Sequence, residues 1–204
     1  DKEGNLWWGT NSNGLLVRRT NGTTEEITHH KGDSFSLPSN HVSSLLIDND
    51  LLWVGSSKTG LAVARLSGIR FDIINTPFGE DVGFISQDAK GTIWIGYDGT
   101  GLTSVDYEGH VKQLYNMSNS PLASNLVLGG TAPSDGHMYL GTYGGGLYHM
   151  TSMGQIERIL PKVPALLYVR HAIKDRKGNL WIGSLRNGLW LLTPHQQLKN
   201  YNYH

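Results

Sequence analysis

The chain has 204 residues and carries 17 Lys and Arg against 17 Asp and Glu, so its formal net charge is zero. A neutral chain without clustered basic residues lacks the electrostatic footprint of a nucleic-acid-binding protein, and we expect no such partner. The absence of cysteine excludes disulfides, cysteine nucleophiles and thiolate metal sites.

A short motif occurs five times along the chain. The first copy is Asp1-Lys-Glu-Gly-Asn-Leu-Trp-Trp-Gly9, and the fifth is Asp175-Arg-Lys-Gly-Asn-Leu-Trp-Ile-Gly183. Each of the five copies is followed within a few residues by Gly-Leu. The glycines that close the copies are Gly9, Gly55, Gly96, Gly141 and Gly183. They recur at roughly 40 to 50 residues, a period typical of a propeller blade array.

The second copy shows the plan of one unit. Four apolar runs, 41–47, 51–55, 61–66 and 70–74, are separated by turn residues. These features predict four short strands in an antiparallel meander. In the first unit the innermost of the four strands is missing, because the chain begins at the turn that would follow it.

The later units repeat this plan. We expect strands at 84–87, 92–96, 102–105 and 111–115, then at 125–128, 137–141, 147–150 and 156–159, and finally at 169–174, 180–183, 189–192 and 198–203. No stretch keeps a helical period for a useful length. We therefore predict one all-β propeller array of four-stranded antiparallel blades, with repeats at about 1–39, 40–80, 81–123, 124–166 and 167–204.

Alternation explains the residue choices in Leu-Trp-Ile-Gly. Trp and Gly point to one face of the strand, and Leu and Ile to the other. Both faces are apolar, so each strand should be covered on both sides, with Gly leaving room for a neighbour's side chain. We assign Trp7, Trp53, Trp94 and Trp181 to the core, since they recur in register.

Two units depart from the motif. The second lacks the turn glycine and is one residue shorter between Asp48 and Trp53. The fourth has Pro133 in the Asp position and Tyr139 in the Trp position.

The sequence from Asp175 to Leu189 resembles the two-component-regulator propeller repeat almost position for position, and the link from Phe35 to Val42 resembles that family's inter-blade segment. The resemblance covers all five copies. It implies a section of a larger, seven-bladed propeller in the periplasmic or extracytoplasmic sensor region of a bacterial hybrid histidine kinase. It also implies a carbohydrate fragment as the ligand. A genuine five-bladed or oligomer-completed ring is the alternative.

Function on a propeller usually resides in the loops of one face. Strand order places the loops after the second and fourth strands together. From these loops we select a mixed aromatic, amide and charged set that suits a sugar, namely Asn40, His41, Tyr97, Asp98, Tyr143, Arg170, His171 and Arg186. Tyr97 and Tyr143 could instead only pack between blades, and Arg170 and His171 could be a solvated rim.

Catalytic alternatives have less support. Neither His-Glu-x-x-His nor Gly-x-Ser-x-Gly occurs. The Gly-x-Ile-Trp strands also resemble streptogramin-lyase propellers, which use a His with a divalent ion, and His171 or His41 could play that part. We expect a sensor fragment with no catalysis, cofactor or metal, a small-molecule or oligosaccharide ligand and a possible homodimer. It would meet a membrane only through segments outside this chain. A propeller enzyme of lyase or glycosidase type and a protein-binding scaffold stay open as alternatives.

Overall fold

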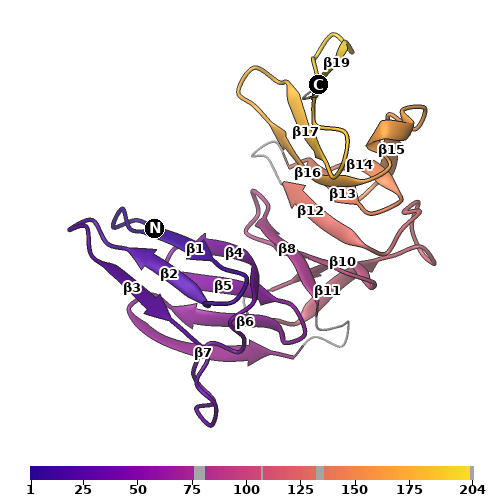
Figure 1. Cartoon of the computed structure of the whole chain (residues 1–204). Coiled ribbons are helices and arrows are strands. Elements are labelled where there is room, and N and C mark those ends of the chain that lie inside the picture. The colour runs from indigo at the N-terminus through magenta and orange to yellow at the C-terminus, as the bar shows by residue number, and fades with distance from the viewer. Residues whose placement is uncertain (76–80, 107, 132–135, 203–204) are drawn as a thin grey trace. The chain divides into compact units, whose positions relative to one another are not determined.

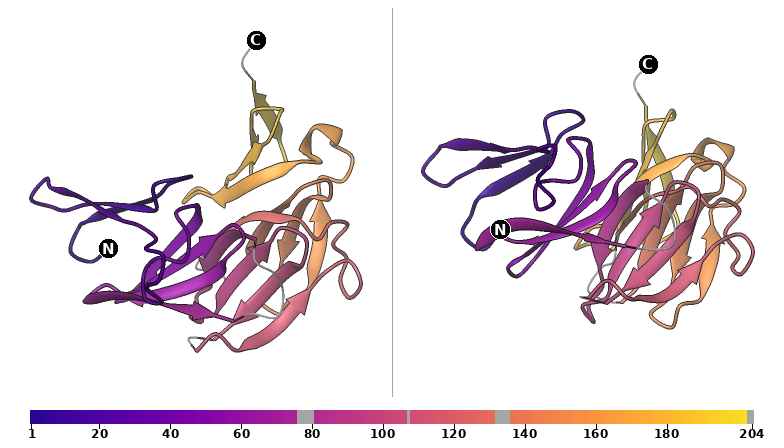
Figure 2. Two further views of the ribbon diagram at one scale, coloured as in Figure 1. Left: turned by 60° about the horizontal axis from the view of Figure 1, so that its bottom comes forward. Right: turned by 90° about the horizontal axis from the view of Figure 1, so that it is seen from below.

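The computed structural model of the chain describes residues 1–75, 81–106, 108–131 and 136–202. Its 19 described strands form five antiparallel sheets (Figure 1). In every sheet the strands follow one another in chain order. Figure 2 shows the ribbon from two further sides. The all-β propeller fold with antiparallel blades is thereby confirmed.

Sheet by sheet, the elements are as follows. The first sheet contains β1 (Leu6–Gly9), β2 (Leu15–Arg18) and β3 (Thr24–Ile27). The second contains β4 (Val42–Asp48), β5 (Leu51–Ser56), β6 (Gly60–Arg65) and β7 (Gly68–Ile74). The third contains β8 (Val82–Gln87), β9 (Ile93–Tyr97), β10 (Gly101–Val105) and β11 (Val111–Tyr115). The fourth contains β12 (Val127–Thr131), β13 (Met138–Thr142), β14 (Gly146–Met150) and β15 (Ile156–Ile159), and the fifth β16 (Val169–Lys174), β17 (Leu180–Ser184), β18 (Leu189–Leu192) and β19 (Leu198–Tyr201).

The first sheet has three strands, as predicted, and the other four sheets have four each. One strand prediction is wrong. The inner strand of the fourth repeat runs over Val127–Thr131 and not over 125–128. The strand continues through Gly129, where a Cβ would stand 2.0 Å from the Arg170 carbonyl oxygen. Only glycine permits the neighbouring inner strand to come that close.

Helical structure is limited, in the part of the chain described, to the 3-10 turn η1 (Pro164–Leu166) between the fourth and fifth sheets. No helix there has the length and apolar character needed to cross a membrane.

The chain divides into two compact units, residues 1–85 and 86–204. In the first unit the core gathers around the fully buried side chains of Leu15, Leu37, Leu52 and Phe71. In the second unit, one core cluster joins the last two repeats through Leu147, Leu166, Val169, Leu180 and Ile182.

The closing glycine of the motif is where successive sheets meet. A Cβ added at Gly9 would lie 2.6 Å from Val42 Cγ1, and one added at Gly55 would lie 2.5 Å from Val82 Cγ1. Gly141 has the same relation to Val169, with Cγ1 at 2.8 Å. In each case the valine begins the inner strand of the next repeat. The prediction that this glycine leaves room for a neighbour's side chain is confirmed.

The Asp-x-x-Gly turn joins its own hairpin to the buried tryptophan. Asp1, Asp88 and Asp175 each accept a hydrogen bond from the indole Nε1 six residues later, at 2.9, 2.9 and 3.0 Å. The second carboxylate oxygen of each Asp accepts two backbone N–H groups of the turn, as Asp175 does from Lys177 and Asn179. One side chain therefore shapes the turn and satisfies a partly buried indole.

The tryptophans lie in the core to different degrees. Trp53 and Trp94 are buried, whereas Trp7 and Trp181 are half-buried. Trp53 belongs to the repeat with the shortened turn, where Asn49 adopts a positive φ of 56°. Among the described residues, its buried Nε1 has no hydrogen-bond partner. The missing residue thus removes the acceptor that three other repeats supply. The Asp position of the fourth repeat, Pro133, lies outside the described residues.

Gly55→Ala should destabilise the chain by about 1–3 kcal/mol, because its new methyl group overlaps Val82. Val82→Ala in the same chain should recover part of that loss, with a coupling energy of about 1 kcal/mol in a double-mutant cycle from urea denaturation. Simple additivity of the two substitutions would contradict this contact.

Trp53→Phe should cost less stability than Trp94→Phe. The first change removes an indole N–H without a partner, and the second removes one bonded to Asp88. A net hydrogen bond contributes about 1 kcal/mol, and a buried unsatisfied donor costs about 1–3 kcal/mol, so the two variants should differ by about 2 kcal/mol or more in free energy of unfolding. Equal losses would show that Trp53 Nε1 has found an acceptor.

Candidate functional site

Short backbone hydrogen bonds connect the second-strand loops to the links that lead into the inner strands. In the second unit, Gly99 N donates to Asn125 O at 3.1 Å, and Gly144 N donates to Leu167 O at 3.1 Å. The loops at 98–100, 143–145 and 185–187 and the links at 124–126 and 167–168 therefore lie on one side of their sheets. We call these segments the loop face.

Tyr143 and Tyr168 form an aromatic pair on the loop face. Their backbones make an isolated antiparallel bridge, and their rings meet edge to face with centroids 4.7 Å apart. Tyr143 is 43% exposed and Tyr168 half-buried. Sequence analysis selected Tyr143 but not Tyr168, although Tyr168 stands in an inter-repeat link where loop-face residues are expected.

Two other predicted residues flank this pair through the backbone. Asp98 forms a bridge with Leu126, whose carbonyl accepts from Tyr143 N at 3.0 Å. On the other side, Leu185 N donates to Tyr168 O at 3.0 Å, which places Arg186 on the next loop. Asp98 and Arg186 are both exposed. An acid, an aromatic pair and a base thus follow one another along the loop face.

Arg170 and His171 lie at the start of β16, at a bulge in its pairing with β17. Arg170 Nη1 donates to the Leu128 carbonyl of the neighbouring inner strand. Partial burial of the imidazole and then the charge of Arg170 lower the pKa of His171.

Tyr97 is 1% exposed and lies within β9, a strand buried along its whole length. A ligand on the loop face would not reach its ring, so this burial favours the packing interpretation over the predicted binding role.

The remaining candidates, Asn40 and His41, belong to the first unit. Asn40 is used internally, since its Oδ1 accepts from His29 N at 2.7 Å and its carbonyl accepts from Gly14 N at 2.9 Å. The Asn40 side chain and backbone therefore help to fix the link between the first two sheets. His41 is exposed.

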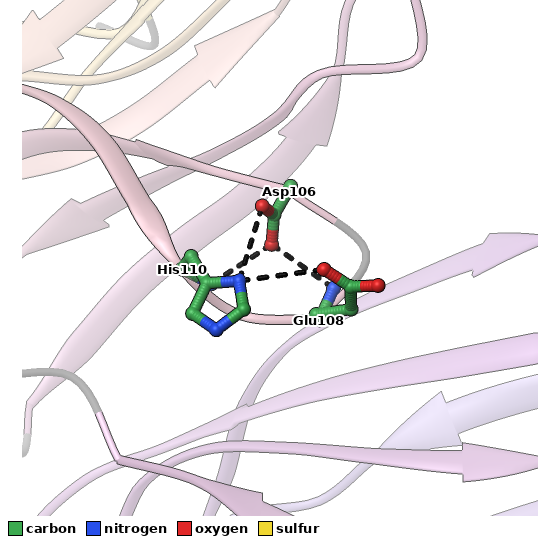
Figure 3. A group of neighbouring side chains, drawn as sticks. All are labelled: Asp106, Glu108 and His110. Atoms are coloured by element: carbon green, nitrogen blue, oxygen red, sulfur yellow. Dashed lines mark hydrogen bonds and ion pairs between the residues drawn. The ribbon is translucent and has the colours of Figure 1, made fainter.

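Asp106, Glu108 and His110 approach one another in the turn between β10 and β11, as Figure 3 shows. Asp106 Oδ1 accepts the backbone N–H of Glu108 and of His110, and Oδ2 pairs with Lys112 Nζ at 2.8 Å. The hydrogen bond from Lys112 is the main reason that the pKa of Asp106 lies far below its usual range. These contacts explain the cluster: Asp106 caps the turn, and Lys112 balances its charge.

On the opposite side of the second unit, where the Asp-x-x-Gly turns lie, a polar chain crosses the fourth sheet. His137 Nδ1 lies 2.7 Å from His149 Nε2, and His149 Nδ1 lies 3.1 Å from Glu157 Oε1. The two imidazole planes differ by 7° with centroids 4.9 Å apart. Stacked rings would keep their atoms about 3.5 Å apart. The two rings therefore meet edge to edge, with a hydrogen bond between His137 Nδ1 and His149 Nε2.

Sequence reasoning missed this chain, although a signal was present. His137 stands where Asn5, Thr92 and Asn179 stand in other repeats, in the one unit that has both Pro133 and Tyr139. This repeat lacks both partners of the Asp–Trp hydrogen bond, and the hydrogen bonds of His149 to His137 and Glu157 connect its strands instead.

No protein family profile matches the chain, and no curated protein matches it. Solved structures do. The extracellular domain of a hybrid two-component system from B. thetaiotaomicron aligns over 100% of this chain and 30% of its own length, with a TM-score of 0.83 and 23% identity. A second such domain from that bacterium aligns over 98% of this chain and 36% of its own, with a TM-score of 0.64 and 18% identity.

A streptogramin B lyase aligns almost as well, over 100% of this chain and 67% of its own, with a TM-score of 0.80 and 15% identity. The chain thus spans about a third of the two-component domains. At these identities the likeness concerns the fold. It confirms, at that level, the resemblance to the two-component-regulator propeller repeat and to a section of a larger propeller.

Asp175→Ala should lower stability at neutral pH but not near pH 2. Hydrogen bonds from Asn179 and Trp181 lower the pKa of Asp175 from its usual 3.8 to about 2. The unfolded state therefore binds more protons than the folded state between these values, so this contribution is complete above pH 4 and is lost as pH falls through 2. Urea denaturation of both proteins from about pH 2 to pH 6 would measure it. The exposed Asp72→Ala change on β7 is the control, and a difference independent of pH would contradict the assignment.

Proposed function

We propose that this chain is part of an extracytoplasmic ligand-sensing propeller, and that its loop face binds a carbohydrate fragment without transforming it. The observation that carries the proposal is the Tyr143–Tyr168 pair, an exposed aromatic surface between loops that present Asp98 and Arg186. Sugar rings stack their apolar faces on aromatic side chains, and charged groups bind their hydroxyl or acidic substituents.

The extracellular two-component domains support the sensor part of the proposal, because all of this chain aligns with part of one of them. In such a receptor the propeller would provide recognition, and the signalling output would lie outside this chain. An extracytoplasmic location agrees with the same likeness.

Tyr143→Ala should weaken oligosaccharide binding about fivefold, since one ring–ring contact is worth on the order of 1 kcal/mol beyond its buried area. The backbone bonds of residue 143 do not depend on its ring, so the fold should persist. Calorimetry against a panel of neutral and acidic oligosaccharides would measure the effect. Tyr201→Ala, which removes another exposed tyrosine from β19, is the matched control. Silence of the unaltered chain across the panel would count against the proposal.

A propeller lyase is the second candidate. The streptogramin B lyase likeness favours it, and so does His171, an imidazole with a lowered pKa that could act as a general base. Turnover of a streptogramin that His171→Ala abolishes would establish it. If His171→Ala still binds sugars and the unaltered chain shows no turnover, the result would favour the sensor over the lyase.

A further inference from the structure

Two cavities lie on the side of the Asp-x-x-Gly turns. They occupy equivalent positions between successive repeats. The smaller, of about 280 Å³, lies between the third and fourth repeats, and the larger, of about 680 Å³, lies between the fourth and fifth. Trp94 and Ser104 line the smaller cavity, and the equivalent Tyr139 and His149 line the larger. The cross-strand pairs Trp94–Ser104 and Tyr139–His149 confirm that these positions correspond.

The differences between the two cavities trace to the irregular fourth repeat. In the smaller cavity the indole of Trp94 is held by Asp88. The larger has the smaller ring of Tyr139, packed on His149 with centroids 5.2 Å apart. Glu157 and His137 hold the two ring nitrogens of His149. The wall is therefore fixed by the polar chain, and room is gained where the indole would lie.

Charge also differs. Asp88, Lys90 and Lys112 line the smaller cavity, where Lys112 is paired with Asp106 and the Asp88 carboxylate accepts from the Trp94 indole. The larger is lined by Lys174 and Lys177 and, among the described residues, by no carboxylate. Ile159, Leu160, Leu180 and Leu192 give it an apolar wall, and Thr193 and Gln196 also line it. A cationic rim above an apolar wall is complementary to a ring that carries one negative group.

We propose that the larger cavity is a binding site for a small organic carboxylate carried on a ring. The ring lies between the Tyr139–His149 wall and the leucine side chains, and the carboxylate pairs with Lys177 at the rim. The volume falls within the range of about 300–1,000 Å³ typical of small-molecule sites. This site does not depend on the carbohydrate site proposed for the loop face, since none of the selected loop-face residues lines it.

Calorimetry with 2-naphthoate and with glucuronate tests the proposal and separates an aromatic acid from a sugar acid. Each has an uncharged counterpart, 2-naphthamide and glucose. We expect one acid to bind more tightly than its counterpart, with amide NMR shifts at Gly178, Leu180 and Thr193. Failure of both acids to bind at about 10 mM, or equal binding of acid and counterpart, would overturn it.

Variants assign the binding to this cavity. Lys177→Gln should weaken the acid about three- to fivefold, as expected for a partly exposed ion pair, and leave the uncharged counterpart unchanged. Lys177→Arg should retain affinity, and the exposed Lys199→Gln change on β19 is the matched control. Tyr139→Trp, which restores the residue of the other repeats, should reduce binding of both compounds by filling the cavity. Unchanged affinity in both Lys177→Gln and Tyr139→Trp would place the ligand elsewhere.

Discussion

The close approach of neighbouring sheets at one glycine position governs the rest of this structure. A side chain at Gly55 would overlap Val82, and the same relation recurs at Gly9 and Gly141. Because the sheets meet this closely, the second strand of an internal repeat is covered on both faces, as the fully buried β9 shows. The apolar character of Leu-Trp-Ile-Gly on both faces follows from that covering, and so does the dependence of each repeat on the next.

Turn chemistry complements this packing. An indole placed in a tight interface brings an N–H that needs an acceptor, and the Asp of the turn supplies it in the repeats that keep the motif. The two irregular repeats solve the problem differently. The second leaves the Trp53 donor without a partner among the described residues, and the fourth replaces the indole with a phenol and adds two histidines.

The difference between regular and irregular repeats determines how much of the structure the sequence could predict. Strand positions and sheet order follow from features that repeat, because every copy of the motif marks the same succession of strands. The full extent of the inner strand at Val127–Thr131 was missed because Gly129 serves a close approach to the neighbouring inner strand, and a single sequence does not show that contact. The loop-face neighbours Asp98, Tyr143 and Arg186 followed from strand order, but the burial of Tyr97 and the internal bonding of Asn40 depend on contacts outside the motif.

The cavity of the fourth repeat shows why departures from a repeat are informative. A regular copy places an indole and an aspartate at its interface, and the same Asp–Trp hydrogen bond forms in each such copy. Pro133, His137, Tyr139 and His149 occur together in one copy, so their effects combine at one place. There the ring is smaller, His149 is held by hydrogen bonds to His137 and Glu157, and the described lining carries lysines without acids. Recognition at this interface would therefore be specific to one position of the array, while the regular copies hold the sheets together.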